Sequence, residues 1–375
     1  MQFFDVAIAK GPDGNRVGFF PNCPSAFHDI WDSIKKYNLC NVLAEHFTCP
    51  LGKPSPLLCP PTFTYRERME SPRLPRFKRA ATVAPMQLTE RDRQIIRQIY
   101  QHRFLRSPHI VALIGDGSQQ LLRRLQLLFH HGYLERPRSQ IDYFHQGGSR
   151  HIAYGLGNKG AALLKQEMGA SFRELRSGEK NRSVGRVYLE HALLVSEVML
   201  ALELACRQTG HVRLLTGADL PVTGERERCT PFKWSVKTKE GVKLGVIPDR
   251  VFGLEFPDAN GNPTRAFFFL EADRGTMPVT RRTLAQTSFF RKLLAYEATW
   301  SQGIHRTRFG FHRFRVLAVT TSVERVQSLV NACSQLERGQ GLFLFADRTV
   351  LEKPEGLLST IWQTGRSGET GSLLN

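Results

Sequence analysis

The chain has 375 residues, of which 41% are hydrophobic and 10% aromatic, and its formal net charge is +18. This length is enough for two domains, and the apolar content excludes wholesale disorder. The sequence has no apolar run long enough for a membrane helix and does not begin like a secretory signal. We therefore expect a cytoplasmic protein with no membrane partner.

Residues 1–85 are the least regular part of the sequence. The stretch from Cys49 to Met86 is rich in proline, lacks both a helical and an alternating apolar period, and ends in a basic run. This composition predicts a poorly ordered extension. Because Met86 directly precedes a helix start, translation from Met86, which would leave residues 1–85 out of the native protein, is an open alternative.

Residues 86–165 begin with three predicted helices. Thr89 and Asp92 form a near capping box at the start of the first, whose isoleucines recur with a helical period. The second helix is expected to start with Ser107 as its cap and the third with Ser118, and a glycine ends each of them. The polar positions of these helices lie opposite the apolar stripes.

A basic β-hairpin is predicted after the third helix. Residues 133–135 and 152–156 have the composition of its strands, and the segment between them carries several arginines. Three helices followed by a two-stranded wing is the order of a winged helix-turn-helix. In such modules the third helix enters the major groove, and the wing contacts the DNA backbone or the minor groove.

The third helix and the hairpin carry the candidate DNA-binding residues. Arg and Gln can each form two hydrogen bonds with a guanine or adenine edge, and a basic segment favours phosphates. Residues 86–160 contain 11 Lys or Arg against 5 Asp or Glu. Double-stranded DNA is the expected partner, with a solvated helical bundle and a protein-binding module as alternatives. The candidates are Ser118, Gln119, Gln120, Arg123, Arg124, Arg136, Arg138 and Arg150.

A larger α/β domain is predicted for residues 183–355. We expect residues 166–182 to be a linker and residues 356–375 to be a flexible tail. The domain begins with a long amphipathic helix over residues 186–210, and four strand-like runs, a helix, a strand, a helix and a strand follow. This order predicts a sheet with one crossover to a parallel strand.

Three carboxylates lie near the ends of two strand-like runs. Asp249 precedes one run, and Glu271 and Asp273 are two residues apart on the next, so both project from one face. If residues 258–264 form a hairpin turn, Asp249 comes beside Glu271. Converging carboxylates suit Mg²⁺ or Mn²⁺, which polarises a phosphate and generates hydroxide. The alternative is a structural network in which arginines such as Arg274 hold the acids.

These motifs resemble known families. Pro-Asp at 248–249, followed 22 residues later by Glu-Ala-Asp, resembles the PD-(D/E)XK nuclease superfamily. Residues 86–350 resemble the replication-relaxation family in the segments LTERDRQII, HGYLERP, HALLVSEV, PDR and FLEADRGT. The resemblance implies an α/β (α+β) fold in which a winged helix-turn-helix precedes a nuclease-like sheet domain. It also implies plasmid replication, relaxation or mobilisation, with other proteins of these processes as partners.

The nuclease-like pattern has one departure. Asp273 stands where the superfamily has the lysine that orients the attacking water. Lys292 and Tyr296, four residues apart on the next predicted helix, could replace that lysine and hold a phosphate. Glu197 could add a fourth acid. The candidate catalytic residues are Asp249, Glu271, Asp273 and Lys292, and the first three are the candidate metal ligands.

Three functions follow from this interpretation. The preferred one is a DNA-binding protein of plasmid or mobile-element replication or mobilisation whose nuclease-like domain is degenerate. The second is an active Mg²⁺-dependent DNA endonuclease. The third is a winged-helix transcriptional regulator.

Overall fold

The computed structural model describes residues 8–10, 16–18, 74–115, 117–141, 151–168, 177–221, 232–359 and 362–374. The chain divides into two units, Met1–Ser71 and Pro72–Asn375. In the first unit, β1 (Ile8–Lys10) pairs antiparallel with β2 (Arg16–Gly18). The rest of that unit, and with it most of the predicted poorly ordered extension, lies outside the described residues.

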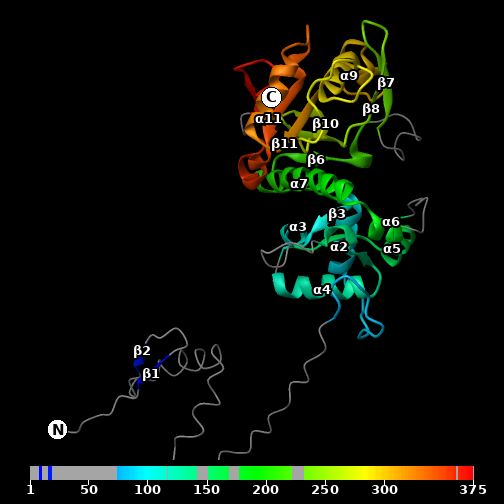
Figure 1. Cartoon of the computed structure of the whole chain (residues 1–375), viewed down its shortest axis with the longest axis vertical. Coiled ribbons are helices and arrows are strands. Elements are labelled where there is room, and N and C mark those ends of the chain that lie inside the picture. Colours follow the sequence, from blue (N-terminus) through cyan, green and yellow to red (C-terminus); the bar gives the residue numbers. More distant parts are fainter. Residues whose placement is uncertain are drawn as a thin grey trace, which may run out of the picture. The chain divides into compact units, whose positions relative to one another are not determined.

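The second unit begins with helices and a small sheet, here called the helical part (residues 74–183; Figure 1). The sheet is antiparallel, with the strand order β3-β5-β4. The elements in chain order are α2 (Glu90–His102), β3 (Phe104–Arg106), α3 (Ser107–Ile114), α4 (Ser118–His130), β4 (Leu134–Glu135), the 3₁₀ helix η2 (Arg138–Gln140), β5 (Ala153–Leu156), α5 (Asn158–Met168) and α6 (Ser177–Ser183).

Local sequence signals explain α2, whereas the predicted serine caps of the next two helices were wrong, because Ser107 and Ser118 are the first residues of α3 and α4 and follow the N-caps Arg106 and Gly117. The Thr89 side chain accepts a hydrogen bond from the Asp92 amide, and the Asp92 carboxylate accepts one from the Thr89 amide, which confirms the predicted capping box. The apolar stripes of α2 and α4 meet in one core, where Ile95 and Leu125 are fully buried. Strand β3 was not predicted, because its three residues continue the helical period of α2.

The helical part is larger than the predicted residues 86–165. Arg79 donates to the carbonyl of Phe129 at 3.0 Å, so the chain before residue 86 packs against α4. The predicted linker over residues 166–182 instead contains, where it is described, the end of α5 and most of α6. Asn181 of α6 donates to the Leu156 carbonyl at 2.9 Å and fastens this helix to β5.

The rest of the unit, the sheet part (residues 186–374), contains a seven-stranded sheet in the order β14-β13-β12-β11-β10-β9-β6. Strands β10, β11 and β12 are parallel, and the other neighbouring pairs are antiparallel. The strands of this sheet are β6 (Arg213–Leu215), β9 (Arg250–Pro257), β10 (Pro263–Ala272), β11 (Phe314–Thr320), β12 (Phe343–Asp347), β13 (Trp362–Thr364) and β14 (Thr370–Gly371). A separate hairpin consists of β7 (Trp234–Lys237) and β8 (Lys243–Val246).

Helices cover both faces of this sheet. Helix α7 packs on one face and lies between the helical part and the sheet, whereas α9 and α11 pack on the other face (Figure 1). The helices are α7 (Arg186–Thr209), α9 (Phe289–Ser301), α10 (Ile304–Thr307) and α11 (Val323–Cys333), with 3₁₀ turns η3 (Gly217–Asp219), η4 (Gln340–Leu342), η5 (Arg348–Glu352) and η6 (Pro354–Gly356). Phe268 and Phe269 of β10 belong to opposite cores because successive strand residues alternate.

The structure changes two expectations for the sheet part. It has two parallel crossovers instead of one, through α9 and through α11. The helix expected after the four strand-like runs is α9, which begins at Phe289, where Ser288 caps it. Residues 356–375, expected as a flexible tail, contribute β13 and β14, because burial of the fully enclosed Trp362 holds this short segment against β12.

Candidate nucleic-acid interface and carboxylate cluster

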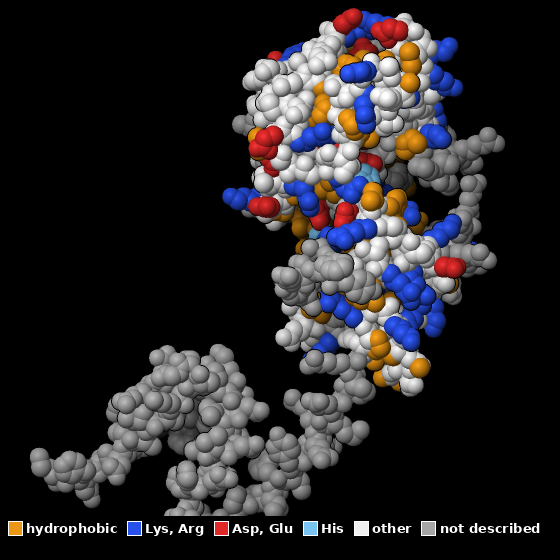
Figure 2. All heavy atoms as spheres, viewed as in Figure 1, with side chains coloured by type: hydrophobic (Ala, Val, Ile, Leu, Met, Phe, Trp, Pro, Cys, Tyr) orange, Lys and Arg blue, Asp and Glu red, His pale blue; other side chains and the backbone are white. Residues whose placement is uncertain are grey.

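Helix α4 presents a polar face to solvent. Ser118, Gln119, Gln120 and Arg123 are exposed, whereas the leucines on the opposite side of the helix are buried. Arg123 forms no hydrogen bond or ion pair with any other described residue. Figure 2 shows Lys and Arg side chains on the visible surface of the helical part. This face can therefore offer hydrogen bonds and one uncompensated charge to a ligand.

Arg124, predicted to contact DNA, instead points into the protein. Its Nε donates to Asp92 Oδ1 at 3.0 Å, and its terminal amino group donates to the Gln87 carbonyl at 3.0 Å. Asp92 is fully buried, and burial alone would raise its pKa. The hydrogen bonds from Arg124 and Thr89 outweigh burial, so the pKa of Asp92 lies below its ordinary value. Arg124 thus holds α4 against α2.

The hairpin arginines also have different environments. Arg136 is 3% exposed, with its guanidinium 4.3 Å from the ring centre of Phe129 and 5.2 Å from that of Tyr154. Burial lowers the pKa of Arg136. This residue joins the hairpin to α4 and does not reach solvent, unlike Arg138, which is exposed in η2. Arg150 lies outside the described residues.

Asp249 and Glu271 lie beside each other, as predicted. Strands β9 and β10 pair antiparallel, and the turn between them follows the expected hairpin. The Asp249 amide donates to the Leu270 carbonyl at 2.9 Å, and the Asp249 carboxylate accepts from the Ala272 amide at 2.8 Å. Its other oxygen lies 2.9 Å from Nε2 of His191 on α7.

Helix α9 supplies the partners of Glu271. This carboxylate is 2% exposed, with one oxygen contacting Lys292 Nζ and the other accepting a 2.5 Å hydrogen bond from the Tyr296 hydroxyl. The four-residue spacing on α9 brings both donors to one face, as the sequence predicted. Lys292 therefore contacts Glu271, the acid that the predicted nuclease-like pattern would pair with a lysine at position 273.

Asp273 belongs to a separate ion pair. Its carboxylate accepts from Arg325 Nε at 2.8 Å and from the Thr320 hydroxyl at 2.7 Å. The partner is thus an arginine from α11, and not Arg274, which lies 3.3 Å from Glu190. Glu197, considered as a fourth acid, instead binds Arg348 at 2.8 Å.

The three predicted metal ligands do not present an open oxygen site. Each carboxylate oxygen of Asp249, Glu271 and Asp273 has a hydrogen-bond or ion-pair partner, and the partners include the cations Lys292 and Arg325. Throughout the described ranges, no three His, Cys, Asp or Glu residues are grouped so that they could hold a metal ion. A divalent cation would have to displace these partners, so the arrangement does not fit Mg²⁺ or Mn²⁺.

The protonation states limit the chemistry of the cluster. Burial raises the pKa of Glu271. Burial by itself would lower the pKa of Lys292, but the charges of Glu271, Asp249 and Asp273 and the hydrogen bond to Glu271 together outweigh it and raise that pKa above the ordinary lysine value. Burial and the adjacent Glu271 also raise the pKa of Tyr296. Lys292 and Tyr296 therefore keep their protons at neutral pH and act as donors, not as general bases.

Comparison with known families determines the family of this chain. The sequence profile of the replication-relaxation family matches residues 96–313, which is more than half of the chain. The chain belongs to the replication-relaxation family. Membership suggests a role in plasmid or mobile-element replication. No curated protein and no solved structure matches the chain.

The replication-relaxation match covers both the polar face of α4 and the contact of Glu271 with Lys292. It includes Arg123 on α4 and the contact of Glu271 with Lys292, but it ends before Arg325, the partner of Asp273. Among the helices that the structure describes in this replication-relaxation protein, none is long and apolar enough to cross a membrane.

Sequence reasoning missed several partners in this replication-relaxation chain. Arg325 lies 52 positions after Asp273, and no local spacing connects them. His191 lies 58 positions before Asp249, and no local spacing connects them either. Its hydrogen bond to Asp249 exists, but its side chain is 33% exposed. The inward direction of Arg124 depends on Asp92 of another helix, although the strong capping signal at Asp92 was visible.

Proposed function

We propose that this replication-relaxation protein binds double-stranded DNA during plasmid or mobile-element replication. In this proposal, the helical part is a winged helix-turn-helix and α4 enters the major groove. The observation that carries it is the exposed polar face of α4, where Gln119, Gln120 and the unpaired Arg123 face solvent. These are the side-chain types that bind adenine and guanine edges through two hydrogen bonds.

Two further features support the DNA-binding role of the helical part. The antiparallel order β3-β5-β4 places a hairpin directly after α4, with Arg138 exposed beside it. Residues 86–160 are also strongly basic, which favours phosphate contacts. Arg124 binds Asp92 and fixes α4 against α2, and Arg136 packs on Phe129 and fixes the hairpin against α4. In this proposal, the binding surface is therefore formed before DNA arrives.

The experiment is a titration, at several salt concentrations, of a labelled duplex that carries the sequence selected by the unchanged protein from a random pool. Replacement Arg123→Ala should weaken binding by about 5- to 100-fold, because a direct arginine contact contributes roughly 1–3 kcal/mol. Arg313→Ala, which removes an exposed arginine just before β11, is the matched control and should bind like the unchanged protein. Equal affinities for all three proteins would contradict the proposal.

For the sheet part, we infer a nuclease-like scaffold whose acids are held by protein cations. The support is the full set of partners around Asp249, Glu271 and Asp273. A metal-dependent endonuclease is the second candidate function. The position of Lys292 beside the acids favours it, but this function requires a divalent cation to displace Lys292 and Arg325 from Glu271 and Asp273.

Nicking of supercoiled plasmid with Mg²⁺ or Mn²⁺ distinguishes these two functions. We expect the unchanged protein and Glu271→Gln to give the same background, since the acids are already occupied. Glu369→Gln, at an exposed acid, is the control for the loss of one negative charge. Nicking by the unchanged protein and by Glu369→Gln, lost in a folded Glu271→Gln variant, would support the endonuclease instead.

A further inference from the structure

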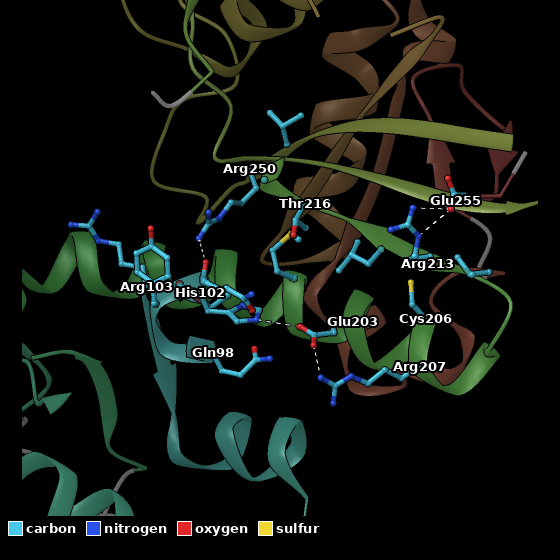
Figure 3. Close-up of a pocket in the computed structure, with 18 of the residues that line it drawn as sticks. Gln98, His102, Arg103, Glu203, Cys206, Arg207, Arg213, Thr216, Arg250 and Glu255 are labelled. Carbon is cyan, nitrogen blue, oxygen red and sulfur yellow. Dashed lines mark hydrogen bonds and ion pairs between the residues drawn. The ribbon is translucent and has the colours of Figure 1, made fainter. Parts of the chain in front are cut away.

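A groove of about 1600 Å³ separates the helical part from the sheet (Figure 3). Its walls come from the end of α2, from α7, and from β6 and β9. Five Lys or Arg residues and two Glu residues are among its lining residues. The charged residues of the groove therefore sum to a positive charge. Which ligand the groove can bind depends on which of these residues are already paired.

The two acids of the groove already have cationic partners. Glu203 accepts a hydrogen bond from Arg207 at 2.5 Å and lies 3.4 Å from His102. Glu255 accepts from Arg213 at 3.0 Å and from Arg265 at 2.6 Å. These pairs are visible as dashed lines in Figure 3 for the residues drawn there. They leave little negative charge for the remaining arginines.

Arg103 and Arg250 have no acidic partner among the described residues. Arg250 donates to the carbonyl of Gln101 at 2.7 Å, and Arg103 lies 5.1 Å from the ring centre of Tyr188. Figure 3 shows both arginines toward the same end of the groove. Burial lowers the pKa of Arg250, and the positive charge of Arg103 lowers it further. Two neighbouring cations are therefore held without an acidic partner, and one of them, Arg250, is half-buried.

The backbone at Arg103 is also unusual. Its φ of 68° and ψ of −51° are rarely adopted by residues with a side chain, and it is the one positive-φ residue other than glycine in the described segments. Glycine would relieve this strain. An arginine at a strained position, beside a second arginine, indicates a use for the side chain that folding does not supply.

We propose that Arg103 and Arg250 form a second DNA site, which binds a backbone phosphate at this end of the groove. The proposal rests on the DNA-binding function proposed above but uses a different surface. A guanidinium matches phosphate geometry through parallel hydrogen bonds, and partial desolvation strengthens each bond. Tyr188, which is 44% exposed beside Arg103, offers a ring on which a base can stack.

The proposed site borders the carboxylate cluster. Asp249 directly precedes Arg250, and its partner His191 lies one helical turn after Tyr188 on α7. A DNA strand bound at the arginines would thus pass next to Asp249, whose carboxylate contacts His191 Nε2. In this proposal, the sheet part helps to hold DNA without cleaving it.

The test compares Arg103→Gln, Arg213→Gln and Arg123→Ala in the full chain. Arg213 lies in the same groove but is paired with Glu255, so it is the matched control. We expect Arg103→Gln to weaken DNA binding about 5- to 20-fold and to reduce the salt slope by about one phosphate contact. Arg213→Gln should leave both unchanged. Arg103→Gly, which relieves the backbone, should lose as much affinity without becoming less heat-stable.

The outcomes separate this site from the α4 interface. If Arg103→Gln binds DNA like Arg213→Gln while Arg123→Ala is weak, the groove site is overturned and the α4 interface stands. If Arg103→Gln is weak while Arg123→Ala is normal, the groove site stands and the α4 interface fails. Inorganic phosphate is the second probe: protection against heat that needs Arg103, together with unchanged DNA affinity in Arg103→Gln, would overturn a DNA ligand.

Discussion

Two adjacent arginines of α4 show how one position on a helix changes a residue's role. Arg123 is exposed and unpaired among the described residues, whereas Arg124 binds the fully buried Asp92. A step of one residue rotates the side chain by about 100° around the helix. The sequence places both arginines on polar positions, and the distinction appears only when α2 brings Asp92 against α4.

We predict that Arg124→Ala lowers the free energy of unfolding by roughly 2–3 kcal/mol, because it leaves a buried carboxylate without its cation. The value is at the low end for a buried pair, since the Arg124 side chain is 27% exposed. Urea unfolding at neutral pH measures the loss. Arg123→Ala is the matched control and should change stability by less than about 0.5 kcal/mol. Equal losses in both variants would contradict the assignment.

At the scale of elements, short-range signals were predictive and long-range partners were not. The Thr89–Asp92 capping box and the turn at Asp258–Asn262 depend on a few neighbouring residues, and both exist. The lysine on α9 that meets Glu271 was also predictable, because helical spacing and the resemblance agreed on Lys292. Arg325 reaches Asp273 only through the α11 crossover, which sequence spacing does not specify.

The shortest strands of the second unit illustrate the same limit. Strands β13 and β14 are three and two residues long, too short for an alternating pattern to be visible. Tertiary burial of Trp362 decides their structure. Strand β3 is also only three residues long, so its pattern could not be seen in the sequence. It follows α2 directly after the strained residue Arg103, which ends that helix.

The start of α3 should respond to mild acid. His109 Nδ1 accepts a hydrogen bond from the Arg106 amide, which requires that nitrogen to be unprotonated. Burial lowers the pKa of His109 from 6.5 to about 4. The unfolded chain therefore takes up this proton first, so the contribution to stability is present above about pH 6.5 and is lost as the pH falls toward about 4.

Urea unfolding across that pH range tests this contribution. His109→Asn should lose less stability between about pH 6.5 and 4.5 than the unchanged protein, because it lacks the titrating group. The comparison between variants is needed because burial also lowers the pKa of His130 and His305. His211→Asn, at an exposed histidine, is the control. Parallel pH profiles for His109→Asn and the unchanged protein would contradict this role.

At the scale of the second unit, side chains connect the helical part to the sheet part. Arg250 donates to the Gln101 carbonyl, Ser196 donates to the His102 carbonyl at 2.8 Å, and Arg207 donates to the Leu113 carbonyl at 2.8 Å. These bonds end on the carbonyls at the end of α2 and in α3. The proposed DNA site in the groove therefore shares its walls with the helices that position α4.

The fold of this unit supports one account of its function. In the functions proposed above, the polar face of α4 reads DNA, the two uncompensated arginines of the groove hold its backbone, and the sheet part with its paired acids provides the frame. The family assignment supplies the setting of plasmid or mobile-element replication. Within this account, the central claim is that Arg123 on α4 contacts DNA directly.

Selection of bound sequences from a random duplex pool tests that claim most directly. The unchanged protein should enrich a defined site, and Arg123→Ala should lose the preference at one or two base pairs while the other positions keep theirs, because one side chain reads a local part of the groove. Selection of the same sequence by both proteins, with equal affinity, would contradict the assignment of α4 as the helix that reads DNA.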